Sequence, residues 1–341
     1  GKLRQAELFT RKAIEINPNN ADSYSNLGII LKTLDKLKEA EFFLRKAIEL
    51  KPHFINAHLN LGNVLHDLGK LQEAENYFLK AIKINPNLAD SYYHLSYLEL
   101  LRGDYKNGLK NYEYRLKREK HFKLNGTPNI SKFDGAELQK KDKLLIISEQ
   151  GLGDTLQYMR YVPYLKTLGL DISFCAKRKL HSLIKSSKID SHPLTPEEAS
   201  EVSEGKWIPL LSLPKYLKVN PDNPVISEPY IFPTYELKKK WKNLLSEENR
   251  PIIGINWQGN PNVENKAPLK GRSLPLETFS TLARNKNYTF LSLQKGFGSE
   301  QLDHCSFKNK FVECQPQIDS TWDFLENAAI IESCDLIITC D

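Results

Sequence analysis

The residues best placed to bind an anion follow directly after an apolar run, Leu144–Ile147. Gly151 and Gly153 come after this run and an amphipathic segment opens at Asp154, which indicates a buried strand, a tight turn and a helix. Such a turn offers free backbone N–H groups and the positive end of a helix dipole to an anion. Taken alone, the pattern favours a plain strand-to-helix turn in which Asp154 caps the helix. It is not a Walker loop, because no Gly-Lys-Ser/Thr follows, and Leu156 replaces the third glycine of a dinucleotide fingerprint.

Two cations follow later strand patterns in the same half of the chain. Arg272 comes after the apolar run Ile252–Trp257, and Lys295 comes after Tyr288–Leu293. Cations at strand exits are placed as clamps for a phosphate would be. Each is also compatible with an ordinary solvated surface charge, and that alternative stays open.

The elements that must position these residues alternate between strand and helix from residue 142 onward. This order predicts parallel sheets with crossover helices, in two Rossmann-like α/β lobes at residues 142–233 and 234–341, with loops at the strand ends lining a cleft between them. Besides the runs already named, apolar or helical patterns are assigned to Asp171–Cys175, Lys177–Lys188, Trp207–Pro214, Leu237–Leu245, a helix from Pro275, Ser320–Glu332 and Leu336–Cys340.

The first 120 residues carry an internal repeat. Pro18, Pro52 and Pro86 recur with a 34-residue period, and the stretches before them are RKAIEINP, RKAIELKP and LKAIKINP. Small residues recur where two helices must approach closely, such as Gly28 and Gly62. We therefore expect helix pairs that stack into a superhelix with a concave inner surface. The polar stretch 121–141 that follows is assigned as a linker.

The third full repeat departs from the pattern. Arg115 stands where the earlier repeats have Ala47 and Ala81, and Lys120 stands where proline is expected. A terminal repeat is expected to deviate, so this one is predicted to cap the array or dock on the next domain. Gly1 aligns with Asp35, which lies between two helices of a repeat, so the first helix is expected to have lost its partner helix.

Composition narrows the class of protein. The chain has 341 residues, of which 40% are hydrophobic and 26% charged, with a net charge of +6. No block of five or six like charges occurs, so a nucleic-acid arm has no support. The five cysteines lack CxxC spacing and are expected to be reduced packing residues of a cytoplasmic protein. No signal peptide or membrane span is evident, and we assign no metal site.

The repeat spacing and its small residues resemble the tetratricopeptide repeat. In the similar superhelix of O-linked N-acetylglucosamine transferases, asparagines on the inner face hold a peptide backbone. Asn26 and Asn60 match that position, and His94 occupies it in the third repeat. Asn63 and His66 extend the polar lining, so the resemblance implies a protein or peptide partner. Solvated groove residues without a fixed ligand are the open alternative.

Residues 142–341 resemble the heptosyltransferase-related lobes of glycosyltransferase family nine, which occur behind tetratricopeptide arrays in bacteria. Six motifs in order carry the resemblance: SEQGLGDTLQYMRYVPYL, IPLLSLP, IGINWQGNP, GRSLPLETF, SLQKG and DFLENAAIIESCDLIITCD. It implies a GT-B architecture with the acceptor on the first lobe and a nucleotide-sugar on the second. Such enzymes usually need no metal, because basic side chains and helix N-termini carry the diphosphate charge.

The resemblance also implies roles for single residues. Asp154 matches the proposed general base, which takes the proton of an acceptor hydroxyl in a reaction that inverts the anomeric centre. Gly151, Gly153 and Thr155 belong to the same acceptor-side loop. The residues that match the donor side, where the diphosphate leaves, are Arg272, Lys295, Gln294, Asn260 and Asp341.

The sequence departs from the family at its end, because the family continues past the strand that matches LIITCD with a donor-binding segment. Both ends of the chain look truncated, and this chain is expected to lack part of the donor site. Two functions follow. One is a glycosyltransferase whose repeats recruit a protein or other large acceptor. The other is a non-catalytic interaction module with a degenerate glycosyltransferase-like region.

Overall fold

The computed structural model describes residues 1–119, 124–261, 273–321 and 323–340. The chain divides into two compact units, each continuous in space but not in sequence. The first comprises Gly1–Lys123 and Leu211–Val225, and the second comprises Leu124–Leu210 and Ile226–Asp341. The segment 211–225 therefore belongs with the repeats, although it lies between strands of the second unit along the chain.

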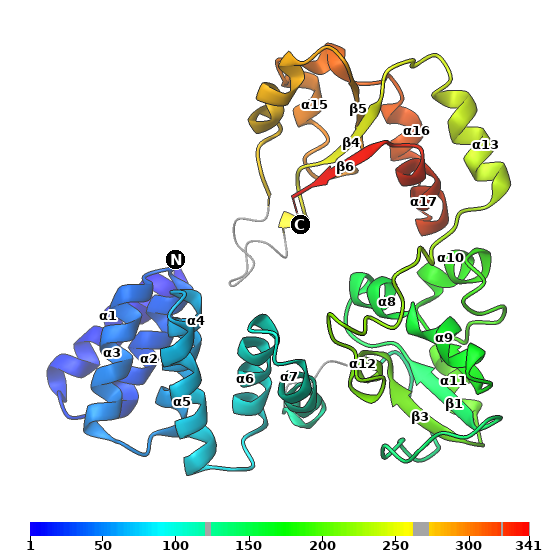
Figure 1. Ribbon diagram of the computed structural model, residues 1–341. Coiled ribbons are helices and arrows are strands. Elements are labelled where there is room, and N and C mark those ends of the chain that lie inside the picture. Colours follow the sequence, from blue (N-terminus) through cyan, green and yellow to red (C-terminus); the bar gives the residue numbers. More distant parts are fainter. Residues whose placement is uncertain (120–123, 262–272, 322, 341) are drawn as a thin grey trace. The chain divides into compact units, whose positions relative to one another are not determined.

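The first unit is built from helices that pack in pairs, drawn from blue to cyan in Figure 1. Helix α2 packs on α3, α4 on α5 and α6 on α7, and each pair also contacts the next pair. This is the stacked helical array that the 34-residue period predicts. The elements are α1 (Lys2–Ile16), α2 (Ala21–Thr33), α3 (Leu37–Leu50), α4 (Ile55–Asp67), α5 (Leu71–Ile84), α6 (Ala89–Leu101), α7 (Tyr105–Tyr112) and the 3-10 helix η1 (Glu113–Lys117).

Glycine allows the two helices of a pair to approach closely. A Cβ added at Gly28 would lie 2.5 Å from Cγ of Leu44, and one added at Gly62 would overlap the ring of Phe78. Both neighbours are fully or almost fully buried in the continuous apolar core of the array. The third repeat has Ser96 at the equivalent position, and this serine is fully buried.

Ion pairs between the second helices repeat with the same period. Glu7 on α1 lies 3.1 Å from Lys36 before α3, and Glu41 on α3 lies 2.9 Å from Lys70 before α5. A second row joins arginine and glutamate, Arg11 to Glu39 at 2.8 Å and Arg45 to Glu73 at 2.7 Å. Because these pairs are partly exposed, we expect each to add only a fraction of a kcal/mol and to help fix the register of stacking.

The irregular third repeat ends in a buried charged contact. Arg115, which breaks the small-residue pattern, is fully buried and donates to Glu113 at 2.8 Å and to Ser212 Oγ at 2.9 Å. Ser212 Oγ in turn donates to Glu113 at 2.8 Å. Ser212 ends the 3-10 helix η3 (Leu210–Ser212) and precedes α12 (Leu213–Tyr216), which packs on α7. The array therefore ends against the segment 211–225, and the predicted proline position, Lys120, lies outside the described residues.

The second unit contains two three-stranded parallel sheets, ordered β2-β1-β3 and β5-β4-β6. In each sheet the first strand of the chain is the central one, and helical segments connect the strands, as the strand-helix alternation predicts. The strands are β1 (Lys143–Ile147), β2 (Asp171–Cys175), β3 (Lys206–Pro209), β4 (Ile252–Asn256), β5 (Thr289–Ser292) and β6 (Leu336–Thr339).

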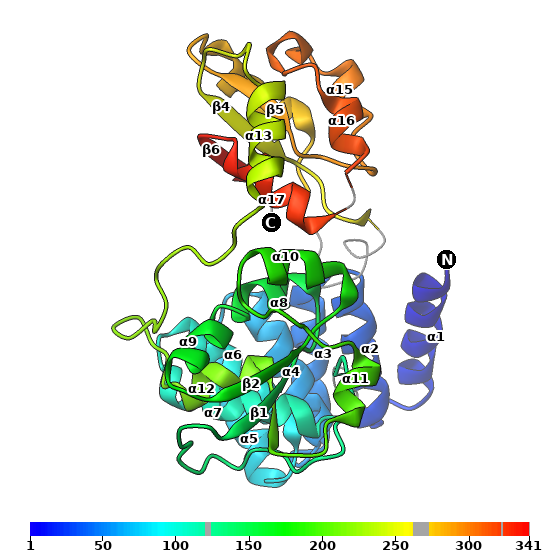
Figure 2. The ribbon, with the colours of Figure 1, turned by 90° about the vertical axis from the view of Figure 1, so that its right-hand side faces the viewer.

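Helices cover both faces of the second sheet (Figure 2). Phe290 on β5 packs with Phe311 on one face, whereas its neighbour Leu291 packs with Trp241 on the other. Burial on both faces is typical of parallel sheets and explains the continuous apolar runs. The covering elements are α13 (Tyr235–Leu244), η4 (Leu276–Arg284), α15 (Gln301–His304), η5 (Lys308–Lys310), α16 (Gln315–Asp319) and α17 (Phe324–Glu332).

The first sheet is covered in the same way. Leu145 and Ile147 pack with Ala199 of α11 on one face, and β2 contacts α9. The helical segments of this part are α8 (Leu152–Tyr158), α9 (Tyr161–Thr167), η2 (Arg178–Leu180), α10 (His181–Ser186) and α11 (Pro196–Glu201).

Two expected helices differ from the observed ones. The stretch expected as one helix, Ser320–Glu332, holds only α17, which begins at Phe324 with Asp323 as its cap, and α16 ends just before it. The helix expected from Pro275 is the 3-10 helix η4, and Pro275 precedes it. Within the described part of the chain, no helix has both the length and the apolar character needed to cross a bilayer.

Replacing Gly62 with alanine tests the close approach of α4 and α5. The new methyl group overlaps the buried ring of Phe78, so we expect the free energy of unfolding to fall by about 1–3 kcal/mol. Thermal unfolding followed by circular dichroism measures the change. Asn76→Ala, at an exposed position of α5, is the control and should not lower the midpoint. An unchanged midpoint for Gly62→Ala contradicts the packing argument.

Candidate functional site

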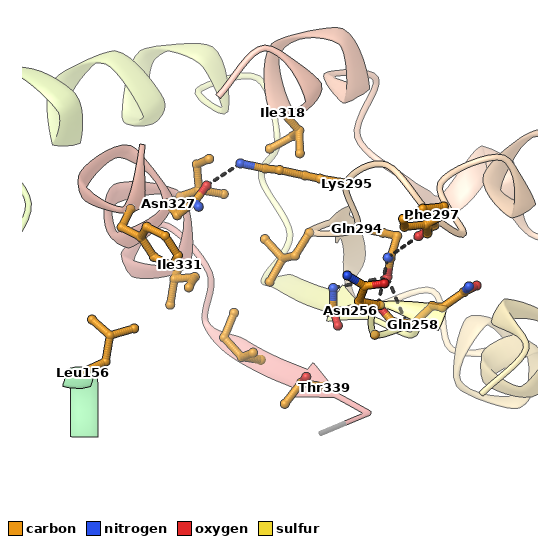
Figure 3. Close-up of a pocket in the computed structure, with 16 residues that line it drawn as sticks. Leu156, Asn256, Gln258, Gln294, Lys295, Phe297, Ile318, Asn327, Ile331 and Thr339 are labelled. Carbon is orange, nitrogen blue, oxygen red and sulfur yellow. Dashed lines mark hydrogen bonds between the residues drawn. The ribbon is translucent and has the colours of Figure 1, made fainter. Parts of the chain in front are cut away.

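A cavity of about 640 Å³ opens at the carboxyl ends of the second sheet (Figure 3). The chain runs from the central strand β4 out to β5 and then across to β6, so the strand order reverses between β4 and β6. In open parallel sheets ligands bind at such a switch point, outside the carboxyl ends of the strands. Asn256 and Thr339, the last residues of β4 and β6, are partners in register and both line the cavity.

The cavity has a polar side and an apolar side. Asn256, Gln258, Asn260 and Thr339 bring amide and hydroxyl groups from the strand ends. No aspartate or glutamate occurs among the described residues that line it. The cavity therefore suits a ligand that is partly apolar and carries no positive charge. Its apolar side comes mainly from Leu293, Ile318, Phe324, Ile330, Ile331 and Ile337.

Lys295 is the one cation among the described lining residues. Its ammonium donates to the backbone oxygen of Thr321 at 2.8 Å and also contacts Thr321 Oγ1 and Asn327 Oδ1, as Figure 3 shows for Asn327. These acceptors are neutral, and no carboxylate of the described residues pairs with Lys295. Burial lowers the pKa of this half-buried lysine, while Glu326 and Asp319 act in the opposite direction.

Gln294, which is predicted for the donor side, lines the cavity, but its amide is bound by the protein. Oε1 accepts from Asn256 Nδ2 at 3.2 Å and from the backbone N–H groups of Trp257 at 3.2 Å and Gln258 at 2.9 Å. Nε2 donates to the backbone oxygens of Gln258 at 2.9 Å and Phe297 at 2.6 Å. The side chain therefore organises the cavity wall. The other predicted donor-side residues, Arg272 and Asp341, lie outside the described residues.

In the turn that is predicted to face an acceptor, Asp154 caps its own helix. Its Oδ2 accepts from the backbone N–H of Gly151 at 2.9 Å, and Thr155 Oγ1 donates to the backbone oxygen of Gly151 at 3.1 Å. The turn thus has the geometry of the simpler interpretation, a capped helix start. Asp154 remains half-buried and Gly153 exposed, so the carboxylate is not enclosed.

The repeats present a second candidate surface, which we call the first-helix face. It is the side of α2 and α4 that carries Asn26, Asn60, Asn63 and His66. Asn26 and His66 are exposed, and Asn60 and Asn63 are half-buried. The two helices contact each other directly, and Lys32 on α2 pairs with Asp67 on α4 at 3.1 Å.

His94 does not extend this row of polar groups in the way its position predicts. Its ring stacks on Phe78, with centroids 5.7 Å apart. Burial, together with the nearby charge of Arg118, lowers the pKa of His94 to about 4. The imidazole is therefore a neutral packing group at neutral pH.

The structure adds residues that the sequence interpretation missed. On α6, Tyr97 is 43% exposed and contacts Tyr93, over whose ring Arg118 lies at 4.2 Å. At the cavity, Asn256 and Asn327 were also missed. Asn256 could have been found as a polar residue at a strand end, whereas nothing in the sequence places Asn327 beside Lys295. Among the described residues, no His/Cys/Asp/Glu cluster could hold a metal ion.

Comparison with known proteins identifies the helical array. Two tetratricopeptide repeat family models match the chain, at residues 9–42 and 55–88. The helix pairs of these segments are tetratricopeptide repeats. No curated protein matches the chain. The glycosyltransferase relationship of residues 142–341 stays a prediction.

Solved structures with similar segments include several tetratricopeptide proteins. MamA is 23% identical over 35% of this chain and 70% of its own, with a TM-score of 0.33. YrrB, described as a TPR protein with an unusual peptide-binding site, is 29% identical over 32% of this chain and 54% of its own, with a TM-score of 0.29. The first TPR of Spaghetti (RPAP3), bound to an HSP90 peptide, is 22% identical over 30% of this chain and 81% of its own, with a TM-score of 0.29.

Replacing His94 with glutamine tests the burial of its ring through pH. Because the folded pKa of His94 lies below the unfolded value, His94 contributes stability above about pH 6.5 that is lost as the pH falls toward 4. This loss is at most about 3 kcal/mol. We expect His94→Gln to flatten the decline of the thermal midpoint over this range. His53→Gln, at an exposed position between α3 and α4, should leave the decline unchanged, and a wild-type slope in His94→Gln contradicts the assignment.

Proposed function

We propose that the tetratricopeptide repeats hold an extended segment of a partner protein on the first-helix face. The supporting observation is that Asn26, Asn60 and Asn63 share this face while no described residue hydrogen-bonds their side-chain amides. Each amide has both a donor and an acceptor, so it can bind a peptide main chain without selecting side chains. Apolar groups accompany them, since Ile29 and Tyr97 are 42% and 43% exposed. The partner is thus recognised mainly through its backbone, with apolar side chains toward the ends.

Selecting a random-peptide display library on the full chain tests this proposal. We expect the double variant Asn60→Ala, Asn63→Ala to weaken the selected peptides about tenfold or more, because each substitution removes hydrogen bonds to the peptide. Gln72→Ala, at an exposed position of α5, should bind normally. Peptides that bind the double variant as tightly as the wild type would place the binding surface elsewhere.

A second function is proposed for residues 142–341, namely transfer of a sugar from a nucleotide-sugar to an acceptor hydroxyl. The observation that favours it is Lys295 in a cavity whose described lining contains no acidic side chain. A nucleotide-sugar combines flat apolar surface with a diphosphate, and the cavity combines an apolar side with this cation. The five free cysteines fit a reducing compartment such as the cytoplasm.

In this proposal each group has one task. The Asp154 carboxylate takes the proton of the acceptor hydroxyl, whose oxygen attacks the anomeric carbon. The bond from that carbon to the diphosphate breaks, and the nucleoside diphosphate leaves with the electron pair. Lys295 and Arg272 stabilise its charge, with Asn260 as a hydrogen-bonding neighbour. The repeats recruit the protein that carries the hydroxyl. If this chemistry is absent, the repeats are the functional part of the chain.

Binding and hydrolysis of UDP-, GDP- and ADP-sugars by the full chain test the second function. We expect Lys295→Ala to weaken donor binding about tenfold or more, because a charge-assisted contact is lost. Asp154→Asn keeps an oxygen that can cap Gly151, so it should bind the donor normally and lose turnover. Lys310→Ala, on η5 and away from the cavity lining, is the control. A Lys295→Ala variant that binds the donor as tightly as the wild type, or an Asp154→Asn variant that keeps wild-type turnover, would contradict the roles assigned to these residues.

A further inference from the structure

Two side-chain contacts join the loops that leave β4 and β5, and a third connects the first of these loops to α15. We call residues 257–260 and 293–298 the exit loops. The amide of Gln294 bridges them, Trp257 Nε1 donates to the backbone oxygen of Gly298 at 3.0 Å, and Gln258 Oε1 accepts from Gln301 at 2.9 Å. The Gln258 side chain fills the space beside Gly298, where an added Cβ would overlap it. The two loops therefore form one packed wall of the cavity.

Gln294 is the centre of this wall. Its side chain is 3% exposed and takes part in five hydrogen bonds, three accepted by Oε1 and two donated by Nε2. Both N–H groups of the amide are thus used within the protein. A glutamine that is saturated in this way has no donor left for a ligand. Its contribution to the cavity must come through the atoms that it holds in place.

The residue next to Gln294 is the cavity cation. Gly296 directly follows Lys295, and Gly298 lies two residues further along the chain. Both glycines have positive φ angles, 64° at Gly296 and 85° at Gly298. Glycine leaves the backbone free to move, so local conformation alone does not fix the direction of the Lys295 side chain. The bonds of Gln294 on one side, and those of Lys295 to Thr321 and Asn327 on the other, fix it instead.

We infer that Gln294 is a positioning residue, which sets the place of the Lys295 ammonium by joining the two exit loops. The statement that Lys295 contacts an anion rests on the proposed nucleotide-sugar function. The positioning itself does not, because it concerns contacts within the unliganded protein. An experiment can therefore contradict the positioning role of Gln294 without contradicting the anion site, and the reverse.

The test measures how Lys295 reacts with an amine reagent. The full chain is acetylated with N-hydroxysuccinimidyl acetate over a range of pH, and mass spectrometry of peptides gives the rate at Lys295. Gln294→Met keeps the length of the side chain and removes all five bonds. Gln294→Glu keeps the accepting oxygen and removes the two donated bonds. Thr289→Val, a buried residue at the other end of β5 that donates to the backbone oxygen of Lys310, is the matched control.

We expect Gln294→Met to raise the limiting rate at Lys295 about fivefold, the factor for losing one hydrogen bond, and to move its apparent pKa up toward that of an ordinary lysine. Gln294→Glu should also raise the limiting rate, and it serves if Gln294→Met fails to fold. Only the rate is compared for this variant, because the added carboxylate raises the Lys295 pKa by its charge alone. Thr289→Val should leave both values unchanged. Wild-type values in the Gln294 variants, or an equal change in Thr289→Val, overturn the inference.

Calorimetry with inorganic pyrophosphate separates this inference from the proposed function. Wild-type protein that binds pyrophosphate, together with a Gln294→Met variant that binds it several-fold more weakly, supports both. If wild-type protein does not bind pyrophosphate, the proposed anion site fails, and the acetylation result still decides whether Gln294 positions Lys295.

Discussion

Hydrogen bonding of β4 along both of its edges is the constraint on which the cavity depends. A parallel partner on each side forces the chain to cross over twice, once toward β5 and once toward β6, so helices must cover both faces. The same order brings the carboxyl ends of all three strands to one edge and leaves an opening where the crossovers diverge. The first sheet has the same order around β1. The cavity thus arises from strand order, and side chains such as Lys295 then decide what it can bind.

The repeats are subject to a different constraint from the sheets, because helix pairs have no strand ends that must lie at one edge. Their constraint is close approach, which Gly28 and Gly62 permit, and stacking then extends one apolar core. The last helix pair of the array has no further repeat to cover its apolar face, so another segment must cover it. At the third repeat the small residue of the pattern is replaced by Arg115, whose guanidinium is buried against Glu113 and Ser212. A buried charge is tolerated only when it is paired and hydrogen-bonded, so this end of the array requires its partner segment.

The sequence predicted those features that repeat or alternate. The spacing of Pro18, Pro52 and Pro86 predicted the helix pairs, and five apolar runs predicted strands within one or two residues. In the run Trp207–Pro214 only the first residues form a strand, β3, and helical turns follow. It could not predict contacts between residues distant in sequence. Arg115 was predicted to belong to a capping or docking repeat, but the sequence does not show that Ser212 is its contact. His94 was predicted to lie in the peptide groove, whereas its ring stacks on Phe78. Gln294 was predicted for the donor side from the sequence, and only the orientation of its amide shows that its hydrogen bonds are internal.

The two proposed sites share one physical property. Buried or half-buried polar groups normally have partners of matching charge, because leaving them without one costs stability. Lys295 is hydrogen-bonded only by neutral oxygens among the described residues, and no carboxylate of these residues pairs with it. The amides of Asn60 and Asn63 are likewise not bound by any described residue, although both are half-buried. A ligand that brings a negative charge to Lys295, or main-chain hydrogen bonds to the asparagines, therefore displaces no carboxylate or amide partner of the described residues, and its binding stabilises the folded state.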